Sequence, residues 1–165
     1  MTITVETGTI VDGANSYVTL AEARAYVTER GKALPSADAQ AESIIIQAMD
    51  FFESHDNQFK GSRVTRDQPL SFPRSGVYVE EWTWAANEIP RQVISAQLAL
   101  IFEINAGEDP FNPPVAEQHK TRKTVGPITV EYSKPNFVSK VVKTSHSSTH
   151  INLLLENSGL NLIRS

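Results

Sequence analysis

The sequence contains no cysteine, which excludes a disulfide framework, a thiolate nucleophile and a thiolate metal site. No apolar run approaches the roughly 20 residues that span a bilayer. The first residues, MTITVETGTIVDG, lack the basic start and the apolar core of a secretory signal. We therefore expect a chain that is made inside the cell, does not bind a membrane, and gains its stability from packing or from association.

Motifs of the common catalytic and cofactor sites are also missing: there is no phosphate loop, GxGxxG, GxSxG, HExxH or acidic calcium loop. His146 and His150 have the spacing that could bind a metal from one face of a helix. No helix signal covers them and no third ligand is near, so a metal site is not expected. Glu80 and Glu81 are adjacent and point apart, which disfavours paired acid–base chemistry. We expect no enzyme activity and no cofactor.

Charge is distributed unevenly along the 165 residues, whose net charge is −4. An acidic chain argues against a dedicated nucleic-acid binder, because such proteins gain much of their affinity by neutralising phosphates. Residues 1–115 carry a balance of −8, whereas residues 116–150 carry +4. A basic segment after an acidic body would suit a molecule whose tail lies on the body of a like molecule. Two solvated surfaces with a chance imbalance are an equal alternative.

The clearest helix signal is in residues 88–107, EIPRQVISAQLALIFEINAG. Pro90 suits the first helical position, and Gly107 suits the left-handed residue beyond a helix end. Apolar residues recur at helical spacing and extend past a single stripe, which predicts a central helix contacted on several sides. This surface consists of Val93, Ile94, Ala96, Leu98, Leu100, Ile101 and Phe102.

Two further helices are predicted ahead of it, at residues 19–31 and 36–54. The first has the capping box of Thr19 and Glu22 at its start. The second has Ser36 as its N-cap candidate and a broad apolar face. We expect both helices to pack on the central helix.

Residues 57–87 lose the helical periodicity and are rich in glycine, proline, arginine and aromatic residues. A connection this long is uncommon unless its own side chains order it or it has a function. We favour a loop packed over the helices, because the segment also contains acidic residues; a surface that stacks on and neutralises a single nucleic-acid strand is the alternative. The residues that allow both interpretations are Phe59, Arg63, Arg66, Phe72, Arg74, Tyr78, Trp82 and Trp84.

The predicted organisation is one domain with three parts. Residues 1–115 form a helical body with an N-terminal strand, residues 116–135 a β arm, and residues 136–165 an extended C-terminal tail. The predicted fold class is therefore mainly α: a small bundle of three to four helices with a long packed loop, a β-hairpin or strand arm and an extended tail.

An apolar patch follows the polar part of the tail. A terminal segment stays ordered only when something holds it, and the sequence leaves open whether the patch docks on its own core or on a partner. The docking candidates are Ile151, Leu154, Leu155, Leu160 and Leu162.

A basic cluster in the arm is the second candidate surface. On a strand, residues 120 and 122 share a face, so the cluster could touch phosphate weakly or contact an acidic neighbouring subunit. The subunit-contact candidates are Lys120, Arg122, Lys123, Val130 and Tyr132.

Five segments, in order and spacing, resemble a family of tailed-phage head–tail connector (adaptor) proteins. They are SYVTLAEARAYVTERG, AESIIIQAMDFFESHDNQFKG, QPLSFPRSGV, EIPRQVISAQLALIFE and KTVGPITVEY, and the match as a whole covers roughly residues 14–135. Some members of that family carry the label of a DnaT-like single-stranded-DNA-binding protein. Members often have tryptophan where this chain has Phe59 and Phe72, and both changes keep an aromatic anchor.

The resemblance implies a structural virion protein: a closed ring of about twelve subunits beneath the portal, in the neck of a tailed phage. Such a ring joins the portal to a tail or neck protein and lets double-stranded genomic DNA pass through its channel. It would be made and assembled in the host cytoplasm. In this setting the apolar patch would dock on the portal, and the basic cluster would contact the next subunit.

A single-stranded-DNA-binding module of a replication or primosome system is the second hypothesis. It predicts stable binding to single strands with a steep salt dependence, whereas a ring predicts self-association and little affinity for free DNA. The acidic balance favours the ring, so the connector is the preferred prediction.

Overall fold

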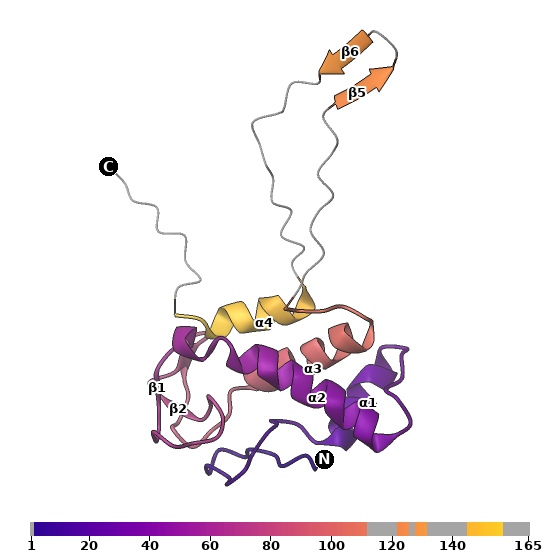
Figure 1. Ribbon diagram of the computed structural model, residues 1–165. Helices are drawn as coiled ribbons and strands as arrows, with labels where there is room; N and C mark the ends of the chain where they lie inside the picture. Colours follow the sequence, from indigo (N-terminus) through magenta and orange to yellow (C-terminus); the bar gives the residue numbers. More distant parts are fainter. Residues whose placement is uncertain (1, 112–121, 126–127, 132–144, 157–165) are drawn as a thin grey trace, which may run out of the picture.

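The computed structural model describes residues 2–111, 122–125, 128–131 and 145–156 (Figure 1). This part of the chain contains four α-helices: α1 (Leu20–Glu29), α2 (Asp38–Glu53), α3 (Arg91–Asn105) and α4 (His146–Leu154). α3 contacts each of the other three, with α4 alongside it on one side and α2 on another. The prediction that this helix is the centre of the fold is therefore confirmed.

The core forms where α2, α3 and α4 meet, because each helix presents apolar residues at helical spacing. On α3 the buried face is broad, as the sequence predicts, and it includes two polar residues, Gln92 and Gln97, of which Gln97 is fully buried. Gln97 accepts a hydrogen bond from the backbone N–H of Tyr17 (2.9 Å) and donates one to Ser16 Oγ (2.8 Å), which attaches the N-terminal segment to α3. The largest apolar side chains of this core are Ile45, Phe52, Leu100, Ile101 and Leu154.

The starts of α1 and α2 differ in how they are capped. In α1 the predicted capping box is confirmed: Thr19 Oγ1 accepts from the backbone N–H of Glu22 (3.1 Å), and the Glu22 carboxylate accepts from the backbone N–H of Thr19 (2.7 Å). The predicted N-cap at Ser36 is wrong, since α2 begins without a side-chain cap. The Ser36 carbonyl instead accepts from Arg24, which also pairs with Asp38 (2.7 Å) and so joins α1 to α2.

In the described part of the chain, three antiparallel strand pairs occur outside the helices. Gly61 allows the first pair to approach closely: it has φ +73°, and a Cβ there would lie 2.3 Å from the carbonyl oxygen of Ser75. A 3₁₀ turn, η1 (Asp56–Gln58), precedes that pair. β1 (Ser62–Arg63) pairs with β2 (Arg74–Ser75), β3 (Tyr78–Val79) with β4 (Trp82–Thr83), and β5 (Arg122–Val125) with β6 (Ile128–Glu131).

The predicted fold class needs correction: the protein is a small mixed fold, mostly helical, in place of a mainly α bundle. The loop between α2 and α3 contains two of the strand pairs, so backbone hydrogen bonds order it as well as side chains. The predicted extended tail contains α4. The predicted N-terminal strand forms only one isolated bridge among the described residues, Val5 to Ser16. The Glu6 carboxylate accepts hydrogen bonds from the backbone N–H groups of residues 8, 10 and 11, and these bonds turn the chain back on itself.

α4 lies in a segment whose polar composition does not predict a helix, but the segment has a capping residue and buried residues at helical spacing. The Ser145 hydroxyl caps its start by accepting from the backbone N–H of Ser148 (3.2 Å). Ser147, Ile151 and Leu154 recur at i, i+4 and i+7 and are all buried against the body. No helix in the described part of the chain is long and apolar enough to span a membrane.

Candidate functional site

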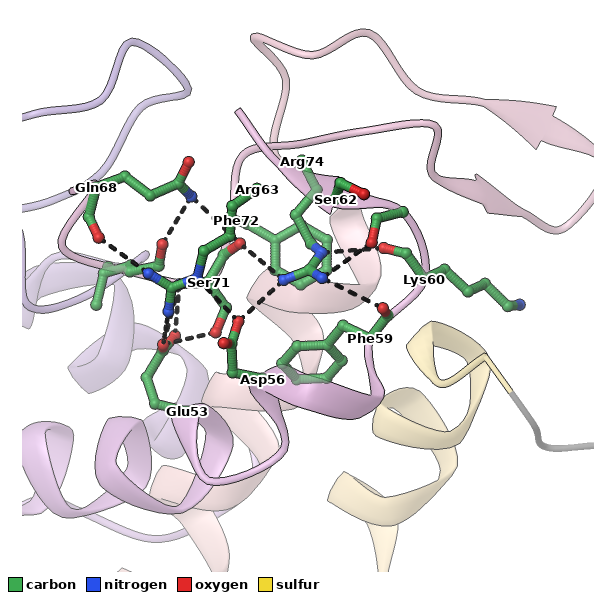
Figure 2. A network of polar contacts seen from close by, with 12 residues as sticks. Glu53, Asp56, Phe59, Lys60, Ser62, Arg63, Gln68, Ser71, Phe72 and Arg74 are labelled. Atoms are coloured by element: carbon green, nitrogen blue, oxygen red, sulfur yellow. Dashed lines mark hydrogen bonds and ion pairs between the residues drawn. The ribbon is translucent and has the colours of Figure 1, made fainter. Parts of the chain in front are cut away.

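A polar network closes the first half of the loop between α2 and α3 (Figure 2). Arg74 is at its centre, with its side chain 8% exposed and 2.9 Å from the Asp56 carboxylate. The same guanidinium donates to the backbone carbonyls of Phe59, Lys60 and Gly61, at 3.4, 3.1 and 2.9 Å. Arginine suits this position because its planar fork offers five donors in fixed directions.

Two carboxylates of this network have shifted pKa values. Burial would raise the pKa of Asp56, but hydrogen bonds from Ser71 and Arg63 and the nearby charge of Arg74 outweigh it, so the pKa lies below its usual range. Burial raises the pKa of Glu53, and the hydrogen bonds that it accepts from Ser71 (2.9 Å and 2.6 Å) offset this only in part. Through these hydrogen bonds and ion pairs the network attaches the loop to the end of α2 and to η1.

These contacts decide between the two interpretations of the arginine and aromatic residues for this half of the loop. Phe59 and Phe72 are each 1% exposed and pack on one another with ring centroids 5.3 Å apart. Arg63 donates to Asp56 (3.2 Å) and to the carbonyl of Gln68 (3.2 Å). The prediction of a packed loop is confirmed here, and these side chains do not form a surface for a strand to stack on.

The second half of the loop is a β-ribbon of β3 and β4 with a different character. Its two-residue turn, Glu80-Glu81, has φ +52° and +69°. Positive φ at both central positions is the backbone of a type I′ turn, which suits the twist of a hairpin but usually takes Asn-Gly. Non-glycine residues held in this region cost free energy and tend to occur at functional sites.

The ribbon exposes two large aromatic side chains, Tyr78 (55% exposed) and Trp82 (73% exposed). Successive strand residues point to opposite faces. Val79 pairs with Trp82, so these two share a face with Val77 and Trp84, whose backbone N–H donates to the Val77 carbonyl (3.0 Å). Tyr78 points to the opposite face. The valines of the first face are buried, which leaves the ribbon with one aromatic ring exposed on each side.

A depression of about 260 Å³ lies between this ribbon and the first residues of α3. Glu80 accepts hydrogen bonds from the Arg91 guanidinium (2.6 Å) and from the Gln92 amide (2.6 Å), which ties the turn to the helix. The hydrogen bond from Arg91 holds the pKa of Glu80 below its usual range. The Arg91 side chain remains 76% exposed. The residues lining the depression are Val79, Glu80, Trp82, Trp84, Arg91 and Gln92.

A second depression, of about 370 Å³, lies at the other end of α3. Asp50, Glu108 and Asp109 line it, and an exposed aromatic ring, Phe111, borders it. Three carboxylates would repel phosphate. Although larger, this depression is the poorer candidate for an anionic ligand.

The predicted docking patch is described only in part. Ile151 and Leu154 are buried in the protein's own core through α4, and Leu155 is half-buried and forms a bridge with Phe59. Lys60 holds the same end of α4, donating from its backbone N–H to the Leu154 carbonyl (2.9 Å) and from Nζ to the Leu153 carbonyl (2.9 Å). Of the docking candidates, Leu160 and Leu162 lie outside the described residues.

The predicted subunit contacts lie in the β5–β6 hairpin or beyond the described residues. Arg122 and Lys123 belong to β5, and Lys123 is directly opposite Val130 of β6. Lys120 and Tyr132 lie outside the described residues. Their role stays a prediction.

His146 and His150 do share one helical face, although the sequence analysis found no helix signal for them. Their ring centroids are 5.4 Å apart on α4. Within the described ranges no group of three or more histidine, aspartate or glutamate residues could hold a metal ion. Burial, together with the charge of His146, lowers the pKa of His150, and Glu80 acts in the opposite direction.

The ribbon and the start of α3 combine exposed aromatic rings with an exposed arginine, which is the composition of a site that stacks on bases and contacts phosphate. A comparison with protein families matches residues 1–164 to the family described as "Putative DnaT-like ssDNA binding protein". The chain therefore belongs to this family. Searches of curated proteins and of solved structures found no match.

The family assignment corrects the preferred prediction from the sequence. The chain was expected to belong to the phage head–tail connectors, and that expectation is wrong, because the matching family is one of DnaT-like single-stranded-DNA-binding proteins. The virion ring beneath a portal, with a DNA channel, has no support and is withdrawn. The alternative hypothesis, a single-stranded-DNA-binding module, is the better supported one.

Sequence reasoning missed the ribbon as a separate unit. The signal was present in VYVEEWTW, where bulky residues alternate on both sides of Glu80-Glu81. The turn has no glycine or asparagine, the residues that normally mark a two-residue hairpin. Tyr78 and Trp82 were therefore grouped with the buried aromatic residues of the loop, although they are its exposed ones.

Proposed function

We propose that this protein binds single-stranded DNA, in a replication setting, through the β3–β4 ribbon and the start of α3. Trp82 and Tyr78 are the stacking surfaces, and Arg91 contacts a phosphate. The observation that carries the proposal is the exposure of Trp82, 73% of whose surface is accessible on a ribbon that α3 holds in place. Membership of the DnaT-like family supports the same ligand.

Stacking fits this site better than binding by charge alone. Each base–aromatic stack contributes about 1–3 kcal/mol and tolerates any sequence. Among the described residues, Arg91 is the only basic side chain that lines the depression, and Glu80 already pairs with it. A single-strand contact contributes a slope of roughly −0.7 to log K against log salt. We therefore expect a shallow salt dependence of binding, in place of the steep one that the sequence analysis attached to this hypothesis.

Tryptophan emission offers a direct test, because both tryptophans of the chain, Trp82 and Trp84, are in the ribbon. Titrating the protein with an oligothymidylate of about 16 nucleotides, a large site for one binding module, is expected to quench the emission to saturation. Duplex DNA of equal length is expected to do so only weakly. Absence of binding to the single strand at low salt would refute the proposed function.

Variants locate the site. Trp82→Ala is expected to weaken binding by about 1–3 kcal/mol, measured by anisotropy of a labelled oligonucleotide. Phe111→Ala is the matched control, since Phe111 is also an exposed aromatic residue (60%) but lies beyond the other end of α3. Equal losses in both variants, or none in Trp82→Ala, would place the binding surface elsewhere.

A further inference from the structure

Two polar atoms beside the depression have no hydrogen-bond partner among the described residues: the indole Nε1 of Trp84 and the amide Oε1 of Gln92. Both atoms are buried, and Gln92 as a whole is only 4% exposed. Leaving a buried polar group unpaired costs free energy, so most such groups in folded proteins are paired. Finding two of them in one small site therefore calls for a ligand that pairs them.

The two atoms are complementary in kind. An indole N–H can only donate a hydrogen bond, and an amide oxygen can only accept one. The other end of the Gln92 amide is already fixed, since Nε2 donates to Glu80 (2.6 Å), and this determines which end of the amide is left free. Trp84 and Gln92 both line the depression, so a ligand that enters it and displaces the atoms covering these two groups would meet one donor and one acceptor.

We infer that the depression takes the Watson–Crick edge of one unpaired nucleobase, with Gln92 Oε1 accepting from the base and Trp84 Nε1 donating to it. This inference rests on the proposed function and specifies its ligand. Each of the four DNA bases presents a donor next to an acceptor on that edge; in thymine these are the N3–H and a carbonyl oxygen. The site therefore needs a free base edge and has no requirement for a particular base.

The size of the depression fits an edge and excludes a larger ligand. Pockets that enclose drug-sized molecules measure about 300–1,000 Å³, whereas this one is about 260 Å³ and open to solvent beside Trp82. A base can enter by its edge while its sugar and phosphate stay outside. Arg91, which is exposed at the rim, is then placed for the phosphate.

The pairing gives a physical reason for selecting single strands over duplex DNA. In a duplex the Watson–Crick edges are hydrogen-bonded to each other, so neither Gln92 nor Trp84 could be satisfied. An unpaired base has a free Watson–Crick edge, so no base pair has to be broken before it binds. Pockets that bind a base outside its stack recognise it through hydrogen bonds to this edge. Stacking on Trp82 alone would not require a free edge.

The test compares two oligonucleotides of equal length and charge: an oligothymidylate and its N3-methylthymidine counterpart, which keeps the ring but loses the N3–H. For the natural protein we expect binding of the methylated strand to be about three- to tenfold weaker, the effect of one or two hydrogen bonds. Trp84→Phe keeps a ring and removes the N–H; Gln92→Met keeps the length and removes the acceptor. Gln92→Met is expected to bind the two strands with nearly equal affinity, because it removes the group that accepts from the N3–H. Trp84→Phe removes only the donor to the carbonyl oxygen, so it is expected to bind both strands more weakly and to keep a preference for the unmethylated one.

The ratio of the two affinities within one variant does not depend on how much of that variant is folded, which protects the test from loss of stability. Phe111→Ala, which removes an exposed ring beyond the other end of α3, is the control and is expected to keep the three- to tenfold preference. If the natural protein binds both strands equally, the inference is overturned while single-strand binding stands. If it binds neither strand, the proposed function fails, and the inference fails with it.

Discussion

Arg74 and Asp56 form an ion pair of 2.9 Å in which the guanidinium is almost completely buried and the carboxylate is about a quarter exposed. The pair joins η1, which follows α2, to β2, and its arginine also donates to four backbone carbonyls between them. A buried charge pair is not in itself strongly stabilising, but removal of one partner is costly, because the groups that remain lose their hydrogen bonds. The loop therefore depends on this arginine more than on its other charged residues.

The first prediction concerns the two arginines that share the Asp56 carboxylate. Arg74→Met is expected to lower the free energy of unfolding by about 2–4 kcal/mol, because four backbone carbonyls and a carboxylate lose a donor. Arg63→Met is the matched control; its side chain is 31% exposed, and its loss is expected to cost about 1 kcal/mol or less. Urea unfolding measures both. Similar losses of unfolding free energy in the two variants would show that the burial of Arg74 does not determine how much it contributes to stability.

The second prediction concerns the turn of the ribbon. Glu81 has φ +69°, where a side chain costs about 1–2 kcal/mol and glycine costs nothing sterically. Part of this gain is lost to the greater freedom of glycine in the unfolded chain, roughly 0.5–1 kcal/mol. Glu81→Gly is therefore expected to raise the free energy of unfolding by about 0.5–1 kcal/mol. Glu81→Ala removes the same charge but keeps Cβ. If this variant were also more stable to unfolding, the cause would be the loss of charge and not the relief of backbone strain.

The third prediction follows from the position of His150 on α4. Burial and the neighbouring charge of His146 lower its pKa in the folded state, against a smaller opposite effect of Glu80. Its pKa in the unfolded chain is about 6.5, so between this value and the lower folded value the unfolded state binds more protons. Stability is therefore expected to fall as the pH drops from about 7.5 to about 5.5. His150→Gln should reduce this fall in urea midpoint, and an unchanged pH dependence would exclude His150 as its source.

The fourth prediction tests the packing of α4. Leu154 is completely buried, so Leu154→Ala is expected to cost about 2–5 kcal/mol in the free energy of unfolding. Leu153 is the neighbouring leucine and is only half-buried, so Leu153→Ala is expected to cost about 1 kcal/mol. Thermal or urea unfolding distinguishes the two. If both substitutions were neutral, α4 would contribute nothing to the core.

The helices of the body could be predicted because local signals and packing agree there. A few neighbouring residues are enough to predict the capping box of Thr19 and Glu22 and the boundaries of α3. α4 was missed because its buried residues, Ser147, Ile151 and Leu154, include a serine. Ser147 can be buried because the Glu103 carboxylate accepts hydrogen bonds from its backbone N–H (2.9 Å) and from its hydroxyl (2.6 Å). Glu103 is distant in sequence, so no local pattern predicts this contact.

Only part of the candidate site can be predicted from the sequence. Composition identified a loop with arginines and aromatic residues, but alternation in a ribbon of two-residue strands is too short to show which rings are buried. Phe72 and Trp82 look alike in the sequence, yet one is 1% exposed and the other 73%. The unpaired atoms of Trp84 and Gln92 depend on packing between the ribbon and α3, which no local pattern encodes.

The bonds from Lys60 to the end of α4 have a consequence for the order in which the protein acquires its structure. Lys60 and Leu153 are 93 positions apart, and at 5–20 residues per second a ribosome needs roughly 5–20 s to make that interval. α3 is complete at Asn105 and α4 at Leu154, so for roughly 2–10 s of this time the side of α3 that α4 covers has no cover from α4. Closing so long an interval is also entropically slow. The nascent chain therefore presents an apolar helix face for seconds, a window in which chaperones or aggregation compete with folding.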